Sequence, residues 1–477
     1  MLLEIVARNG CARLPQAENF CYQTRKISPR ICAAAPRPVT WGVLAVDVGS
    51  NTWVTIMKHA LAPVAALLVG ASILLTGQGL QGTLLPVRAA IENFSTLSIG
   101  IIGGAYFLGF TLGCLKCGEL VQRVGHIRVF AAMTALASAT PLIHGLLLSP
   151  FAWGLLRFLT GFCFAVLYVV IESWLNDRST NENRGIVFST YVMITLTVLA
   201  AGQMMTLLYD PVDMHLFAIA SVLVSIAAIP VVLSKSESPE VPETVQLDIP
   251  RLYRISPVGT IGCLAIGLTN GAFWSLAPVF TAGYSTDASL AAWFMTSAVI
   301  GGAILQWPLG FLSDKFGRRN VLMAAALGGA AAAIVIVMTI NSVSFVGINL
   351  LGMAWGSMAF PLYALAVAHA NDHAEPNEMV TVSGGLLLMF GGGAIVGPFL
   401  ASAVMELANE SGLYLYTAAI HVLLVLFVVV RITRRETSPE EQHVPFGDAL
   451  ATAHTASQFY NEEMVHHAEA EENQAAD

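Results

Sequence analysis

The amino-acid sequence contains a long internal repeat, in which residues separated by a fixed offset of 192 positions are similar. The most distinctive pair of segments is residues 118–128 (GELVQRVGHIR) and residues 310–319 (GFLSDKFGRR). The same offset matches further pairs, which are Gln78 with Asn270, Pro86 with Pro278, and Gly109 with Gly301. Because one offset holds over successive parts of the chain, we expect two halves that arose by duplication.

The chain is too apolar for a water-soluble protein of 477 residues, because 56% of its residues are hydrophobic and 11% are charged. The apolar residues fall into twelve runs of about 20 residues, the length that a helix needs to cross a bilayer. An all-α integral membrane protein is therefore predicted. The expected membrane-spanning helices are residues 61–87, 97–115, 129–148, 151–174, 187–208 and 216–233, then 258–282, 290–312, 321–340, 345–368, 382–405 and 414–430.

The repeated segment is expected to form a short charged loop between two helices. Gly310 and Gly317 allow a tight bend. Basic residues keep such a loop on the cytoplasmic side, and this copy has three, Lys315, Arg318 and Arg319. An acid at Asp314 can face the positive N-terminal end of a neighbouring helix. We expect both copies to act as gating loops.

The distribution of basic residues predicts the orientation of the chain. With the N-terminus inside, the cytoplasmic segments between Lys58 and Arg435 carry fifteen Lys and Arg residues, and the outer segments carry only Arg88. Both termini are therefore expected in the cytoplasm, as an even number of spans requires. Arg88 is expected to mark the outer interface, with attraction of anions as the alternative.

Residues 310–319 resemble the signature loop that the major facilitator superfamily carries after its second helix and repeats after its eighth. The first copy departs from it, with Gln122 in place of an Asp and Ile127 in place of a basic residue. The gating residues that the resemblance implies are Gly118, Arg123, Gly125, Arg128, Gly310, Asp314, Lys315, Gly317, Arg318 and Arg319. Residues 123–128 together with 172–176 (ESWLN) resemble the YcaD-like branch. The resemblance implies a twelve-helix transporter of two pseudo-symmetric six-helix bundles.

The domain organisation expected from these patterns has five parts. Residues 1–55 form an extension that we expect to be disordered or not translated, with the start nearer Met57. A six-helix bundle (56–233), a cytoplasmic linker (234–257) and a second bundle (258–432) follow. The tail, 433–477, has ten acidic residues and no Lys or Arg from Glu436 onward, and disorder is expected there.

A transporter with this fold needs a midplane cavity lined by a few polar groups. Gln78 and Asn270 occupy repeat-equivalent positions, and Gln81 lies one turn beyond Gln78. Their amides can donate and accept hydrogen bonds, which suits neutral or zwitterionic solutes, although they could equally staple helices together. Trp274 and Gln306 complete the predicted cavity. Secondary candidates, for which packing is favoured, are Trp307, Tyr106, Tyr168 and Gln203.

Two charged residues are candidates for energy coupling. Arg157 lies well inside the fourth span and, with Gly161, resembles a pattern that proton-coupled exporters of the superfamily show there. It must face the cavity, water or a partner, and snorkelling toward the outer face is the alternative. Glu172, at the cytoplasmic end of the same span, could bind a proton, but an ion pair with Arg123 or Arg128 is favoured.

No pattern of an enzyme, a cofactor or a metal site is found in the sequence. There is no P-loop, no nucleophile elbow and no HExxH motif, so ATP hydrolysis is not the predicted energy source. Cys114 and Cys117 form an isolated CxxC pair that reads as packing. No basic and aromatic patch indicates nucleic acid. The expected partners are a small-molecule substrate, protons and the lipid bilayer, for a chain that acts as a monomer.

We therefore predict a secondary active transporter of the plasma or inner membrane that moves a small solute by alternating access, driven by an ion gradient or by the solute's own gradient. If the ion is a proton, Arg157 and Glu172 are the candidate coupling residues. Two alternatives remain open from the sequence. One is a membrane sensor built on the transporter fold, with the acidic tail as its output domain. The other is a passive facilitator.

Overall fold

The computed structural model describes residues 61–180, 183–233, 248–285, 287–375 and 378–432, and these contain helices but no strand. Twelve of the helical segments are long and apolar enough to cross a membrane, which confirms the predicted all-α membrane fold. The elements are η1 (Ala62–Val64), α2 (Ala65–Ile91), α3 (Thr96–Val124), α4 (His126–Leu146), α5 (Pro150–Asp177), α6 (Arg184–Met204), η2 (Met205–Leu207), α7 (Met214–Ile226), α8 (Ala228–Val232), α9 (Ile249–Ile255), α10 (Pro257–Ala282), α11 (Ala288–Phe316), α12 (Arg318–Thr339), α13 (Phe345–Ala359), α14 (Leu362–Asn371), α15 (Met379–Ala408) and α16 (Gly412–Ile432). The predicted extension and acidic tail lie outside the described residues, as does the linker up to residue 247.

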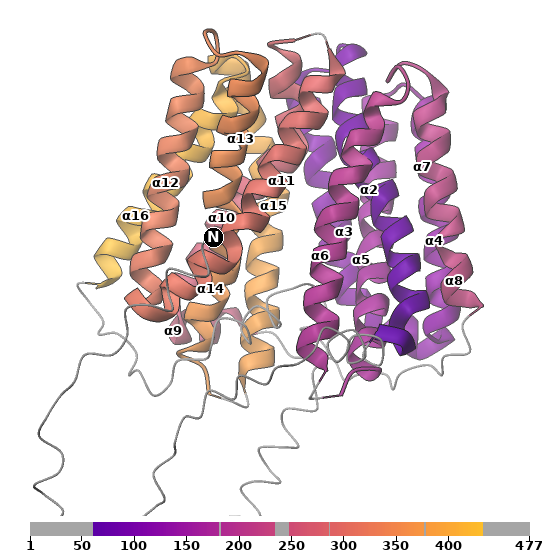
Figure 1. Cartoon of the computed structure of the whole chain (residues 1–477), viewed down its shortest axis with the longest axis horizontal. Helices are drawn as coiled ribbons and strands as arrows, with labels where there is room; N and C mark the ends of the chain where they lie inside the picture. The colour runs from indigo at the N-terminus through magenta and orange to yellow at the C-terminus, as the bar shows by residue number, and fades with distance from the viewer. Residues whose placement is uncertain (1–60, 181–182, 234–247, 286, 376–377, 433–477) are drawn as a thin grey trace, which may run out of the picture. The chain divides into compact units, whose positions relative to one another are not determined.

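Helices α2 to α8 form one bundle and α10 to α16 form a second beside it (Figure 1). Two predicted spans are broken. The sixth divides into α7 and α8 shortly before Pro230, and the tenth divides into α13 and α14 at Pro361. Proline lacks the N–H that would bond to the carbonyl one turn earlier, so the helix ends or bends there. The predicted linker also contains a short helix, α9, which the sequence analysis missed.

Both bundles contain the same kind of close helix–helix contact, made by pairs of glycines. A Cβ built on Gly109 would lie 1.9 Å from the Phe158 carbonyl oxygen, and one built on Gly161 would lie 2.0 Å from that of Tyr106. Each glycine therefore faces the carbonyl three residues before its partner, and the backbones of α3 and α5 are in contact. Four further pairs repeat this register, Gly301 with Gly356, Gly79 with Gly202, Gly271 with Gly397, and Gly267 with Gly393.

The loops that join α3 to α4 and α11 to α12 are each a single glycine. Gly125 and Gly317 both have a φ of 86°, a conformation that favours glycine, and helix continues on either side. The predicted gating loops are therefore mostly helix ends. Gly118 and Arg123 belong to α3, Gly310, Asp314 and Lys315 belong to α11, and Arg128, Arg318 and Arg319 lie in the helices that follow.

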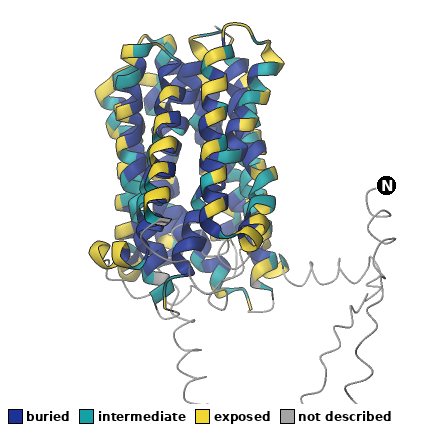
Figure 2. Ribbon diagram, turned by 90° about the vertical axis from the view of Figure 1, so that its left-hand side faces the viewer, coloured by how far each residue is buried: buried dark blue, intermediate teal, exposed yellow. Residues whose placement is uncertain are grey.

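The hydrophobic core is shared between the bundles at one end only. One cluster joins residues of both bundles, such as Leu84 and Phe217 with Phe280 and Tyr414. Two further clusters belong to the first and the second bundle separately. Buried residues lie on the inner faces of the helices, and exposed ones cover the outside (Figure 2). The bundles are thus packed together at the end with the α2–α3 turn, here called the closed end, and are less joined at the Gly125 end.

Candidate functional site

A cavity of about 430 Å³ lies between the two bundles, lined by residues of both. All five residues predicted for a substrate cavity line it: Gln78, Gln81, Asn270, Trp274 and Gln306. Three of the four secondary candidates, Tyr106, Tyr168 and Gln203, also line it. The fourth, Trp307, is not among the lining residues; it is 72% exposed and stacks on Phe311. The volume falls within the range of small-molecule pockets, roughly 300–1,000 Å³.

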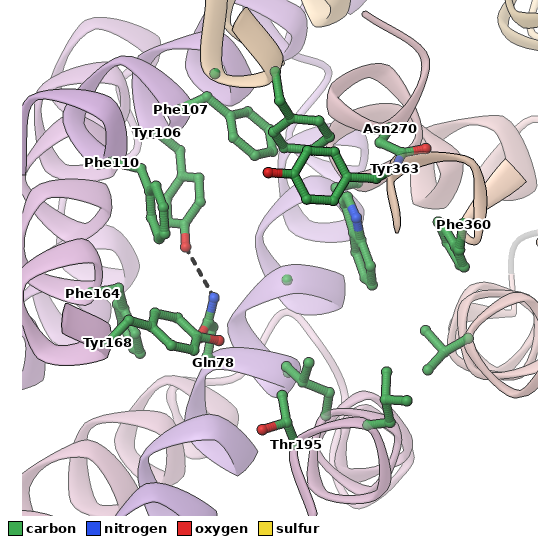
Figure 3. Close-up of a pocket in the computed structure, with 18 of the residues that line it drawn as sticks. Gln78, Tyr106, Phe107, Phe110, Phe164, Tyr168, Thr195, Asn270, Phe360 and Tyr363 are labelled. Atoms are coloured by element: carbon green, nitrogen blue, oxygen red, sulfur yellow. Dashed lines mark hydrogen bonds between the residues drawn. The ribbon is translucent and has the colours of Figure 1, made fainter. Parts of the chain in front are cut away.

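The first bundle presents an amide held between two tyrosines (Figure 3). Gln78 Nε2 donates to the Tyr106 hydroxyl at 2.9 Å, and the Tyr168 hydroxyl donates to Gln78 Oε1 at 2.9 Å. The two predicted roles of Gln78 are therefore combined, because it links α2 to α3 and α5 while it lines the cavity. Because both ends of the amide are bonded, the Gln78 side chain is held in one place on the cavity wall.

Two other amides on the cavity wall have acceptor atoms without a partner. Gln81 Nε2 donates to the Gly77 carbonyl at 3.3 Å, while Gln81 Oε1 has no hydrogen-bond partner among the described residues. Asn270 Oδ1 likewise has none in the described part of the chain. Buried acceptors are usually satisfied, but both of these oxygens are occluded from the cavity, so either could bond a solute only after its side chain or helix had moved.

The second bundle presents an aromatic wall, on the side of the cavity opposite Gln78 and Tyr106 (Figure 3). The rings of Trp274 and Phe360 are stacked, with centroids 5.7 Å apart and planes 11° apart. Tyr363 continues this wall, and its hydroxyl has no hydrogen-bond partner among the described residues. Phe360 lies at the break between α13 and α14, so the helix interruption at Pro361 shapes this part of the site.

Arg157 of α5 lines the cavity and does not snorkel away from it. Its Cζ atom lies 4.3 Å from the centroid of the Tyr106 ring, which is a cation–π arrangement. None of the described residues that line the cavity is Asp or Glu. The guanidinium thus faces a chamber whose other polar groups are amides and hydroxyls.

Glu172 lies far from Arg157 on the same helix, at about 22 Å by the rise of an α-helix. Its side chain is fully buried, and Oε1 accepts a hydrogen bond from the Tyr191 hydroxyl at 3.4 Å. Arg123 and Arg128 are exposed, and neither forms an ion pair with Glu172 in the described structure, so the favoured ion pair is wrong. Because Tyr191 lines the cavity, Glu172 has a connection to it that the sequence did not reveal.

Two residues of the predicted gating loop in the second bundle, Asp314 and Arg318, belong to an ion-pair network that includes the buried Asp372. Arg318 Nε lies 2.9 Å from Asp372 Oδ2, and Arg318 Nη1 lies 2.8 Å from Asp314 Oδ1. Asp314 thus contacts the residue that begins α12, rather than a helix end alone. In the first bundle His126 occupies the place of Arg318, and its Nε2 lies 3.4 Å from the Ser173 hydroxyl.

The remaining predicted gating cations differ in exposure. Lys315 is exposed and lies 5.5 Å from the Phe316 ring centroid, whereas Arg319 is buried. Arg88, expected at the outer interface, is also buried. It donates to the carbonyls of Pro211 and Val212 and lies 2.7 Å from Glu92, so it fixes the segment before α7.

Contacts between the bundles close the cavity at one end. The backbone N–H of Leu97, at the start of α3, donates to Glu406 Oε1 of α15 at 3.1 Å. Nearer the cavity, the Thr296 hydroxyl donates to Gln203 Oε1 at 3.1 Å. At the other end Leu115 lines the cavity and is 40% exposed.

The family model of the Major Facilitator Superfamily matches residues 67–256 and 259–462. The chain belongs to this superfamily. Among similar curated proteins, the uncharacterized MFS-type transporter YcaD of Escherichia fergusonii is 26% identical over 379 residues, covering 79% of this chain and 97% of that protein. An uncharacterized MFS-type transporter of Enterobacter sp. (strain 638) is 27% identical over 372 residues, covering 77% and 95%. The resemblance to the YcaD-like branch is thereby confirmed, and the chain is a multi-pass membrane transporter.

Solved structures agree on the fold. The nucleoside transporter NupG superposes with a TM-score of 0.69 at 15% identity, covering 78% of this chain and 99% of that one. A bacterial homologue of the human lysosomal transporter Spinster, in an inward-facing and occupied conformation, gives a TM-score of 0.61 at 14% identity, covering 85% and 99%. At these identities the likeness concerns the superfamily fold alone.

Several residues of the site were missed by sequence reasoning. Asp372, the buried partner of Arg318, follows α14 as one acid in a short polar segment, and nothing local marks it. Phe360 and Tyr363 flank Pro361, and a proline inside an apolar run could have indicated a break exposing them. Tyr191 has no distinguishing sequence context.

Proposed function

We propose that this superfamily member is a secondary active transporter that moves a small solute across the plasma or inner membrane by alternating access. The observation that carries the proposal is the cavity between the bundles, lined by both and closed at one end by contacts between them. A site at the interface of two pseudo-symmetric halves can be exposed alternately when one half rocks against the other.

The charge distribution supports an inward-facing state. If the basic segments are cytoplasmic, the Gly125 end faces the cytoplasm and the closed end faces outward. The outer closure depends on close contacts between small residues of the two bundles. At Gly100, for example, an added Cβ atom would lie only 2.6 Å from the Pro398 carbonyl oxygen of the other bundle. Such contacts can separate without unfolding either bundle, because each bundle has its own core.

The proposal includes proton coupling at Glu172. A carboxyl group buried inside a membrane protein is costly when ionised, and such groups often mark proton pathways. Tyr191 links Glu172 to the cavity through the hydrogen bond of 3.4 Å, so solute in the cavity and a proton on Glu172 would be connected by one side chain.

Access to Cys114 tests the inward-facing resting state. Cys114 lines the cavity although it is only 5% exposed, whereas Cys263 is fully buried and does not line it. In a variant that keeps Cys114 as its one cysteine, the impermeant reagent 2-sulfonatoethyl methanethiosulfonate should label inside-out vesicles faster than right-side-out vesicles. A variant that keeps only Cys263 is the control. Equal labelling rates from both sides would contradict an inward-facing resting state, and labelling from outside alone would reverse the orientation.

Transport itself is tested in sealed proteoliposomes with a metabolite panel, under an inward or outward proton gradient. Accumulation against a concentration gradient is expected, and equilibration without accumulation contradicts active transport. A chain lacking residues 436–477 should keep this activity. The sensor alternative replaces the transporter under two conditions. The full-length protein moves no solute of the panel, and the chain without the tail folds but no longer produces the cellular response of the full-length protein.

A further inference from the structure

Arg157 is the only charged side chain among the described residues that line the cavity. These lining residues also include five amides and ten aromatic side chains, and none of them is Asp, Glu, Lys or His. The empty cavity therefore carries a single positive charge. A charge of this kind inside a membrane protein is costly unless something compensates it.

Nothing in the described part of the chain neutralises Arg157. Its close contact is the face of the Tyr106 ring, 4.3 Å from Cζ, and the guanidinium makes no hydrogen bond or ion pair with a described residue. Tyr106 is already an acceptor from Gln78. The five N–H donors of the guanidinium are thus left for whatever enters the cavity, in a planar arrangement that matches a carboxylate.

We propose that the cavity binds an organic monoanion with an aromatic body, its carboxylate paired with Arg157. Binding of this anion does not depend on the proposed function. Only the statement that the bound anion is transported rests on it. Arg157 belongs to the first bundle, and the stacked pair Trp274 and Phe360 belongs to the second. One solute with a charged and an aromatic end would therefore contact both bundles at once.

The rest of the wall bears on which charge class can bind. Gln81 Oε1 and Asn270 Oδ1 have no partner among the described residues, but both oxygens are occluded in this conformation, so they take no part in the recognition proposed here. A cation would be repelled by Arg157, and none of the described residues that line the cavity is an acid that could hold it. A neutral solute would leave the guanidinium uncompensated, and a dianion would bring an excess negative charge.

An isosteric series of indoles tests the charge requirement. The purified full-length protein is melted with indole-3-acetate (anion), indole-3-acetamide (neutral) or tryptamine (cation) at millimolar concentration, and affinities are measured by titration calorimetry. We expect indole-3-acetate to raise the melting temperature and the other two to have little effect, since ligands that bind the native state stabilise it. Arg157→Gln should weaken the binding of indole-3-acetate, raising its Kd by about tenfold or more. Arg157→Lys should retain part of the affinity.

Lys116→Gln is the matched control, because Lys116 is an exposed cation outside the cavity, paired with Glu119. It should leave the affinity for indole-3-acetate unchanged. The proposal is overturned if indole-3-acetamide binds as well as indole-3-acetate, if Arg157→Gln keeps the affinity, if no member of the series binds, or if sodium chloride alone blocks indole-3-acetate by occupying Arg157 as a halide site.

The transport assay separates this inference from the proposed function. If anions bind through Arg157 but proteoliposomes move none of them, the transporter proposal fails and the anion site stands. If a neutral solute is accumulated equally by the parent protein and by Arg157→Gln, the transporter proposal stands and the anion site fails.

Discussion

Arg318 Nε lies 2.9 Å from Asp372 Oδ2, and each of these side chains is only 2% exposed. The pair joins the first turn of α12 to the residue that follows α14, so it fixes the Gly317 end of the second bundle. In the first bundle His126 takes the place of Arg318 and contacts Ser173 and the Trp174 ring. The two halves thus share the same single-glycine turn but stabilise it by different chemistry.

The buried pair predicts a difference between two acids. Asp372→Asn should lower the free energy of unfolding by about 3 kcal/mol, because it leaves a buried guanidinium with one fewer carboxylate. Asp314→Asn should cost about 1 kcal/mol or less, since Asp314 is 38% exposed. Thermal unfolding of both variants in the same detergent is the measurement, and equal losses would contradict the assignment of Asp372 as the buried anchor.

The glycine contacts predict position-specific damage on one helix. Gly161→Ala places a methyl group within 2.0 Å of the Tyr106 carbonyl oxygen, so α3 and α5 must separate, at a cost of about 3 kcal/mol. Gly154→Ala on the same helix meets nothing within 4 Å and should stabilise by up to about 1 kcal/mol. Melting temperatures decide this, and a Gly161→Ala protein as stable as the parent would disprove the backbone contact.

The tyrosine that supports Arg157 has two separable functions. Tyr106→Phe removes the hydroxyl that accepts from Gln78 and should cost about 1 kcal/mol of stability, while the ring still faces Arg157. Tyr106→Leu removes the ring as well and should cost about 1 kcal/mol more. The two variants are compared by thermal unfolding and by indole-3-acetate affinity. If Tyr106→Phe and Tyr106→Leu have the same effect on both, the ring contact is unimportant.

Glu172→Gln is expected to uncouple transport from the proton gradient. The amide resembles a permanently protonated carboxyl, so solute exchange should continue at equilibrium while accumulation driven by a pH gradient is lost. Tyr191→Phe, which removes the hydrogen-bond donor, should alter the pH dependence less. Counterflow and gradient-driven uptake in proteoliposomes distinguish the two activities, and gradient-driven accumulation that survives Glu172→Gln assigns coupling elsewhere.

Arg157→Ala and Asp314→Asn are each expected to abolish transport without preventing membrane insertion. Arg157 would lose the charge that holds the solute, and Asp314 would lose its contact with Arg318 across the Gly317 turn. Membrane fractionation and uptake are measured on the same preparations. Normal uptake in both variants would discard the roles proposed for these residues.

Much of the fold could be predicted from local patterns. Runs of about 20 apolar residues gave the twelve spans, because a bilayer accepts only helices with satisfied backbone groups. The offset of 192 matched Gly109 with Gly301 and also relates Gly79 to Gly271, and all four prove to be contact glycines. Their partners, Gly202 with Gly397 and Gly161 with Gly356, are 195 residues apart and escaped the comparison.

The candidate site was predicted in part. Gln78, Gln81, Asn270, Trp274 and Gln306 do line one cavity, since polar or aromatic residues at repeat-equivalent depths lie near the interface of the halves. The expected ion pair of Glu172 was wrong, because depth along a helix does not tell which neighbouring helix a side chain faces. Tyr191, which lies on α6, could be assigned to Glu172 only from the packed structure.

The sequence by itself determined that this chain crosses the membrane as a duplicated set of apolar helices, because hydrophobic length and charged turns act locally. Only the tertiary structure decided which side chains meet. Arg157 and the Trp274–Phe360 pair are separated by more than a hundred residues, and Arg318 pairs with Asp372, which follows a different helix. Such pairings depend on how the packed helices are rotated and shifted relative to one another. Glycine contacts and proline breaks determine this rotation and shift, whereas apolar runs do not.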